Sequence, residues 1–113
     1  MNILPTEIII EIFKYLSFNE LIKLELVNKF IKLIIRTNKW RNITVKPKDN
    51  SDIINFFIDN YSFINYDFSF CNQITDASVS LLANCHKLDL SGCNQITDSM
   101  KAKLKETVKN FQY

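Results

Sequence analysis

The sequence predicts an α+β chain in which three short N-terminal helices are followed by about three strand–turn–helix units. The first forty residues carry apolar side chains at helical spacing, with helix-start signals between them. The rest of the chain contains Cys-Asn-Gln-Ile-Thr-Asp twice, starting at Cys71 and again at Cys93, a period of 22 residues. Periods near this length are typical of units that stack on one another. We therefore expect a helical domain over residues 1–41 and a repeat domain over residues 42–113, with units at about 43–65, 66–87 and 88–113.

Composition fits a chain that folds around a core and excludes several functions. Of the 113 residues, 47% are hydrophobic and 23% are charged, and the net charge is +2 with both signs interspersed. A nucleic-acid-binding face normally shows clustered Lys and Arg, so this charge favours neither DNA nor RNA. No apolar run approaches the roughly 20 residues needed to span a bilayer. We expect no membrane partner.

The three cysteines stand in a chain without secretory features, which indicates reduced thiols and a cytoplasmic and/or nuclear location. The residue usage, rich in Ile, Asn and Lys, is typical of an A/T-rich genome. If the source is a virus, we expect the protein to be located in the cytoplasm of the host cell.

Local signals place the three helices. Pro5 suits the first turn of a helix over residues 6–16, because its missing N–H would have no partner there. Ser17 and Glu20 form a Ser-x-x-Glu capping box, which predicts a second helix from Phe18 to about Val27. Asn28 is the expected cap of a third helix that reaches about residue 37.

The first and third helices carry more apolar surface than one buried face requires. Apolar side chains of the first helix cover roughly 220° of its circumference, against about 100° for a helix with one buried face. An exposed apolar patch of this size marks an interface. We expect core positions at Leu24, Leu26, Leu33 and Ile34, and we expect Trp40 to lock the end of the third helix against the next segment of the chain.

Several fixed spacings in this region agree with one family. The residues are Leu4-Pro5-x-Glu7, Ile8, Ile9, Ile12-Phe13, Leu16, Leu21, Leu24, Val27, Phe30 and Trp40. This pattern resembles the F-box, a bundle of short helices that binds a Skp-family adaptor and thereby joins a Skp–cullin–F-box ubiquitin ligase. The resemblance covers residues 4–41. It implies a Skp-family adaptor as partner, a cullin through it, and adaptor contacts from Leu4, Pro5, Ile8, Ile9, Ile12, Phe13, Leu16, Leu21 and Val27.

One spacing departs from the F-box pattern. The family places a tryptophan four residues after the valine, whereas the aromatic here, Phe30, follows Val27 after three. The segment to Trp40 is one residue short as a result. This departure leaves open the register of the third helix and the roles of Phe30 and Ile31.

The repeated segments predict the same local structure in each copy. Tyr66-x-Phe68 aligns with Leu88-x-Leu90, and such alternation places both apolar side chains on one face of a short strand. Thr75 and Thr97 are expected helix N-caps, each followed by an Asp that suits the positive end of the helix dipole. The expected buried helix positions are Val79, Leu82, Met100 and Leu104. A worn first copy is expected to have a strand at residues 43–45 and a helix capped by Ser51 or Asp52.

The segment LDLSGCNQIT resembles the core of cysteine-containing leucine-rich repeats, which often follow an F-box. The usual repeat of that family is a few residues longer than 22. The resemblance implies an unknown protein target, and we expect target contacts from Asp67, Ser69, Asp89 and Ser91. For Asp67 and Asp89 the alternative is a structural turn in which the carboxylate accepts hydrogen bonds from nearby backbone.

No pattern predicts catalysis, a metal or a cofactor. Cys71, Cys85, Cys93 and His86 lack the Cys-x2–4-Cys pairing of structural zinc sites. Gly92 is the single glycine, which excludes a glycine-rich phosphate loop. The sequence therefore predicts a non-catalytic receptor subunit of a ubiquitin ligase.

Two alternatives stay open. One is a helical nucleic-acid-binding module with the second and third helices as a helix-turn-helix. Against it, the would-be recognition helix carries Ile31, Ile34 and Ile35 where Arg, Asn or Gln would read bases. The other is a structural repeat protein whose F-box no longer docks.

Overall fold

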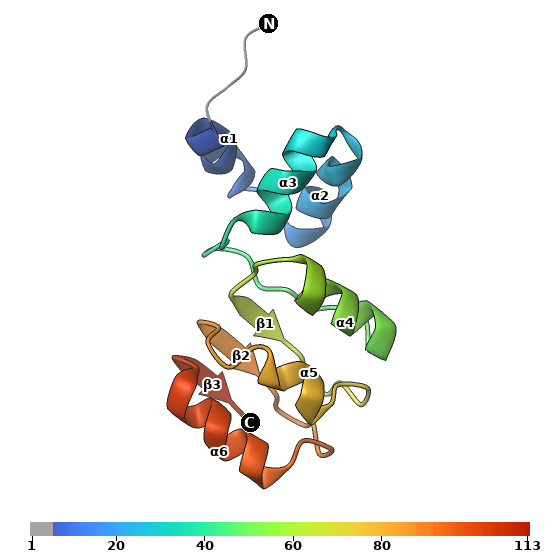
Figure 1. Ribbon diagram of the computed structural model, residues 1–113, viewed down its shortest axis with the longest axis vertical. Helices are drawn as coiled ribbons and strands as arrows, with labels where there is room; N and C mark the ends of the chain where they lie inside the picture. Colours follow the sequence, from blue (N-terminus) through green and yellow to red (C-terminus); the bar gives the residue numbers. More distant parts are fainter. Residues whose placement is uncertain (1–5) are drawn as a thin grey trace, which may run out of the picture.

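Helices occupy one end of an elongated molecule and a small parallel sheet with its own helices fills the rest (Figure 1). The computed structural model describes residues 6–113, and its principal extents are 54 × 25 × 19 Å. The expectations for Leu4 and Pro5 lie outside the described residues. No helix among residues 6–113 has the length and apolar character that a membrane span requires.

The helical end consists of α1 (Thr6–Phe13), α2 (Phe18–Lys23), the 3-10 helix η1 (Leu24–Leu26) and α3 (Lys29–Thr37). The predicted caps are confirmed. The Glu20 amide donates to Ser17 Oγ at 3.2 Å and the Ser17 amide donates to Glu20 Oε1 at 3.1 Å, which completes the capping box. Asn28 Oδ1 accepts a hydrogen bond from the Ile31 amide at 2.8 Å and so begins α3.

Two predicted helices are shorter than expected. The first ends at Phe13 rather than at residue 16, because the amides of Tyr15 and Leu16 donate to the carbonyls three residues before them and so tighten the last turn. The second changes from α-helix to the 3-10 helix η1 after Lys23.

The second part alternates helices and strands. Its elements are α4 (Ser51–Asn60), β1 (Asn65–Asp67), α5 (Asp76–Ser80), β2 (Lys87–Asp89), α6 (Asp98–Thr107) and β3 (Asn110–Gln112). The three strands are parallel in the order β1-β2-β3, and Tyr66 pairs with Leu88, which pairs with Phe111. The helices α4, α5 and α6 succeed one another along the long axis in step with the strands (Figure 1).

Two expectations for this part are corrected, and one strand was not expected. The strand expected at residues 43–45 is reduced to a single parallel bridge between Val45 and Tyr66. The cap of α4 is Asn50 rather than Ser51 or Asp52, since Asn50 Oδ1 accepts from the Asp52 amide at 2.9 Å and the Ile53 amide at 3.1 Å. The sheet also gains β3 at the end of the chain, a strand that the sequence pattern did not predict.

The repeated hexapeptide forms the turn and the helix start that it predicted. Thr75 Oγ1 accepts from the Ser78 amide and Thr97 Oγ1 accepts from the Met100 amide, each at 3.2 Å. The two copies are also joined, because the Thr97 hydroxyl donates to Asp76 Oδ2 at 2.6 Å and the Thr97 amide donates to Asp76 Oδ1 at 3.1 Å. The recurring sequence therefore both starts a helix and attaches it to the neighbouring unit.

One hydrophobic cluster runs through both parts of the molecule, from Leu21 to Val108. Trp40 is 2% exposed, and its indole Nε1 donates to the Ile35 carbonyl at 3.0 Å, so it locks the end of α3 as expected. Ile34 is buried as predicted, but the core expectation is wrong for Leu26 and Leu33, which are 91% and 58% exposed.

A polar cluster joins the two parts where α4 meets the helical end. Arg36 Nε donates to Glu25 Oε1 at 2.9 Å, and the Tyr61 hydroxyl donates to Glu25 Oε2 at 2.7 Å. The Arg36 guanidinium also lies 5.0 Å from the centre of the Tyr61 ring. Burial and the hydrogen bond to Glu25 raise the pKa of Tyr61 to about 12. The Tyr61 hydroxyl therefore stays protonated and continues to donate throughout the neutral range.

We expect Tyr61→Phe to lower the free energy of unfolding by about 1–3 kcal/mol, because it removes a hydrogen bond to a charged, largely buried carboxylate. Urea unfolding at neutral pH measures the change. Tyr15→Phe is the matched control, since Tyr15 is 82% exposed and loses only a solvent-facing hydroxyl. Equal effects of the two substitutions would contradict a stabilising role for the Glu25–Arg36–Tyr61 cluster.

Candidate docking surfaces

The helix α1 has apolar side chains on two sides, and only one side faces the rest of the chain. Ile10, Phe13 and Leu16 pack against the core, and α1 contains no fully buried residue. On its other side Ile8 and Ile12 are 47% and 52% exposed. These two residues are four apart and therefore share a helix face. The excess apolar arc predicted from the sequence is thus an exposed surface.

A second exposed apolar group lies on η1 and the start of α3. It consists of Leu26, Val27, Phe30 and Leu33, of which Val27 is 59% and Phe30 is 46% exposed. An open groove of about 270 Å³ between α1 and α3 has Ile10 on one side and Phe30 and Leu33 on the other. The groove joins the second group to Ile10, which lies on the opposite side of α1 from Ile8 and Ile12. We use the name docking surface for the exposed apolar residues of both groups taken together: Ile8, Ile12, Tyr15, Leu26, Val27, Phe30 and Leu33.

The adaptor contacts expected from the sequence divide into three groups. Ile8, Ile12 and Val27 are exposed, whereas Ile9, Phe13 and Leu16 are half-buried. Leu21 is fully buried in the core and is not accessible to a partner, so its assignment as an adaptor contact is corrected.

Sequence reasoning missed four members of the docking surface: Tyr15, Leu26, Phe30 and Leu33. Tyr15 follows Ile8 and Ile12 at the helical i, i+4, i+7 spacing, and this signal was available in the sequence. The turn after α1 keeps Tyr15 82% exposed. The sequence has no comparable signal for Leu26 and Leu33. Their spacing fits a buried position as well as an exposed one.

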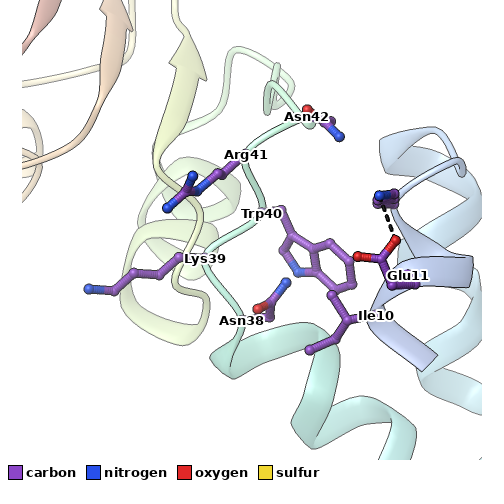
Figure 2. Close-up of a pocket in the computed structure, with 8 residues that line it drawn as sticks. Ile10, Glu11, Asn38, Lys39, Trp40, Arg41 and Asn42 are labelled. Carbon is purple, nitrogen blue, oxygen red and sulfur yellow. Dashed lines mark ion pairs between the residues drawn. The ribbon is translucent and has the colours of Figure 1, made fainter. Parts of the chain in front are cut away.

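A pocket of about 310 Å³ lies between α1 and residues 38–42, the segment that leads into the repeats. Figure 2 shows the Trp40 indole beside Ile10 and Asn38, with Lys39 and Arg41 extending in the opposite direction. Because the indole N–H already donates to a backbone carbonyl, Trp40 offers this pocket an apolar surface.

The strand face carries the residues expected to contact a target. Asp67 pairs in register with Asp89 on the adjacent strand. Asp67 Oδ1 accepts from the Ser69 amide at 2.9 Å and from the Ser69 hydroxyl at 2.6 Å. Asp89 Oδ1 accepts from the Ser91 amide at 2.9 Å. The structural turn considered as an alternative is therefore present in both copies, and it occupies one oxygen of each carboxylate.

Charges on this face are partly paired. Lys46 Nζ lies 3.8 Å from Asp67 Oδ2. Burial alone would raise the pKa of Asp67, but the hydrogen bonds from Ser69 and the positive charges of Lys46 and Lys87 lower it overall. Asp67 is therefore held as a carboxylate well below neutral pH.

The three cysteines are free and buried. Burial raises the pKa of Cys71 and of Cys85 to about 11 each, and it raises the pKa of Cys93. Cys93 Sγ donates to the Phe68 carbonyl at 2.9 Å. Within residues 6–113, no group of three or more His, Cys, Asp or Glu side chains is arranged to hold a metal ion.

Comparison with known families gives one match. Residues 1–46 match the F-box-like family model, which supports an F-box protein and indicates, in general, an adaptor role of the Skp–cullin–F-box type. The matched segment contains α1, α2, η1, α3 and hence the whole docking surface. F-box domains are typically non-catalytic and bind a Skp-type partner. Comparison with curated proteins and with solved structures gives no match.

We expect the three thiols to resist alkylation by iodoacetamide at pH 8 in the folded protein and to react within minutes in denaturant, because the thiolate is the reactive form. The free energy of unfolding should then fall as the pH rises from 9 to 11. In that window the unfolded thiols lose protons that the folded ones still retain. Mass spectrometry counts the modified thiols, and fast labelling of one cysteine in the folded protein would contradict its burial.

Proposed function

We propose that this chain is a receptor subunit of a Skp–cullin–F-box ubiquitin ligase. Its docking surface binds a Skp-family adaptor, and a cullin joins through that adaptor. The face around Asp67, Ser69, Asp89 and Ser91 receives a protein target. The chain itself performs no catalysis and works in the cytoplasm and/or the nucleus.

One observation carries the proposal: Ile8 and Ile12 remain about half exposed on α1, inside the segment that matches the F-box-like family. If the chain covered these side chains with its own residues, no apolar surface would remain there for an adaptor. Instead α1 has an inner side toward the core and an outer side toward solvent. The exposed apolar residues of η1 and α3 form a second group that an adaptor could contact, and a stable interface needs roughly 800 Å² per partner.

We further propose that residues 42–113 are a short leucine-rich-repeat block of about three units. The parallel register of Tyr66, Leu88 and Phe111 and the repeated Thr caps support this assignment. The helical end closes one side of the stack through Trp40 and the Glu25–Arg36–Tyr61 cluster. Such closure removes the need for a separate capping unit at that side.

We expect the double substitution Ile8→Asp plus Ile12→Asp to weaken binding to a Skp-family adaptor by about 100-fold or more, because it places two carboxylates in a desolvated apolar interface. Biolayer interferometry with the purified adaptor measures the affinity. The matched control is Leu81→Asp plus Tyr113→Asp, which adds the same charge at residues that are 67% and 58% exposed outside the F-box-like segment.

Three outcomes would overturn the proposal or part of it. Absence of adaptor binding by the wild-type chain would remove the ligase assignment and favour a structural repeat protein. Equal binding by wild type and Ile8→Asp plus Ile12→Asp would remove the assigned surface. Micromolar binding to DNA or RNA with a steep salt dependence would favour the nucleic-acid-binding alternative.

A further inference from the structure

Phe70 adopts a backbone conformation that its side chain does not favour. Its φ is +61°, and it occupies the position that Gly92, with φ +76°, holds in the second copy of the repeat. The left-handed region is unfavourable for a residue with a Cβ, whereas glycine enters it freely. The turn itself therefore does not require the phenyl ring.

The Phe70 side chain is nevertheless 74% exposed. Its ring lies against Gly92 so closely that a Cβ added there would be 2.4 Å from the ring Cδ1. The Phe70 amide also donates to the Ser91 carbonyl at 2.7 Å. The ring therefore presents an apolar face to solvent. It lies beside Ser91 and Gly92, which follow β2.

On the strand face formed by β1 and β2, some side-chain oxygens have no hydrogen-bond donor among the described residues. Asp67 has Lys46 within 4 Å, whereas Asp89 forms no ion pair among the described residues and uses only Oδ1, for the Ser91 amide. Asn65 lies on the same face of β1 as Asp67, because alternate residues of a strand share a face. Asn65 is 5% exposed, and its Oδ1 has no hydrogen-bond partner in the described part of the chain.

Two carboxylates, those of Asp89 and Asp49, lie near the turn that holds Phe70 and Gly92. Burial raises the pKa of the Cys93 thiol, which adjoins Gly92; hydrogen bonds with the backbone of Cys71 and Phe70 lower it, and the charges of Asp89 and Asp49 raise it. Both Asp49 oxygens are held by backbone amides of the neighbouring turn, at 3.0 Å and 2.8 Å. The nearby cations are Lys46, which pairs with Asp67, and Lys87, which lies two residues before Asp89 and therefore shares its strand face. Neither lysine forms an ion pair with Asp89 among the described residues. A ligand suited to the Phe70 end therefore brings positive charge and hydrogen-bond donors.

We propose that Phe70 and Asp89 form a subsite for an arginine side chain of the target protein. This inference rests on the proposed function, whose target-binding face it extends. The guanidinium stacks on the exposed phenyl ring and donates to the unused oxygen of Asp89. Arginine fits better than lysine because its planar group makes both contacts at once and loses less hydration.

The test is a titration of the ¹⁵N-labelled full chain with a blocked pentapeptide that has one central arginine between serine and glycine residues. We expect the amide signals of Phe70, Ser91 and Gly92 to shift with a Kd in the millimolar range. Replacement of the arginine by citrulline should abolish the shifts. Phe70→Gly and Asp89→Asn should each weaken binding by about threefold or more.

Controls separate this subsite from general charge effects and from misfolding. Asp59→Asn removes one exposed negative charge from α4 and should leave the peptide affinity unchanged. Phe70→Gly installs the residue of the second copy, so its melting temperature should be equal to or higher than that of the wild type. Equal weakening by Asp59→Asn, peptide binding undiminished by Phe70→Gly, or a preference for a glutamate peptide would each overturn the subsite.

The adaptor assay separates failure of the subsite from failure of the proposed function. Phe70→Gly should bind the Skp-family adaptor with wild-type affinity, because Phe70 lies outside the F-box-like segment. Loss of peptide specificity with adaptor binding intact would overturn the subsite alone. Specific peptide binding without adaptor binding would overturn the ligase assignment and leave the subsite standing.

Discussion

The structure depends on one constraint: neither part of this chain can bury its apolar surface without the other. A strand–helix unit of about 22 residues is too small to cover its own hydrophobic face, so neighbouring units must stack. The first unit would leave that face open, and here Leu21, Ile35 and Trp40 from the helical end join the same cluster as Ile54 and Phe63. The single apolar core is therefore the reason that the helical end and the repeats form one elongated body.

The same constraint determines what remains at the surface. The inner side of α1 and the buried residues of α3 are used to close the repeat stack. The outer side of α1 and the exposed residues of η1 and α3 have no counterpart in the described chain. The docking surface is thus what is left after the core is complete. It lies at the helical end of the molecule, away from β2 and β3 (Figure 1).

Local features of the fold were predictable from the sequence, and features set by tertiary packing were not. Ser17, Asn28, Thr75 and Thr97 act as caps because each hydrogen bond spans only three residues, so sequence spacing determines it. The burial of Leu21 and the exposure of Leu26 were not predictable, since periodicity describes an apolar arc but not which part of it faces the chain. The strand β3 has no local signal beyond Phe111, and it forms because β2 offers an unpaired edge.

Comparison of the two repeat copies separates structural positions from those free for recognition. The shared Asp-x-Ser segments form the same turn in both copies, and the shared threonines cap helices. Asp76 of the first copy also accepts hydrogen bonds from Thr97 of the second. Folding therefore explains why these residues recur. Phe70 and Gly92 occupy equivalent places but differ, although glycine alone would satisfy the backbone at both. The exposed Phe70 ring is not needed to form the turn, because the second copy forms the same turn with glycine. This divergence is the reason that we place the proposed arginine subsite at Phe70, with Asp89 contributing the oxygen that its turn leaves unused.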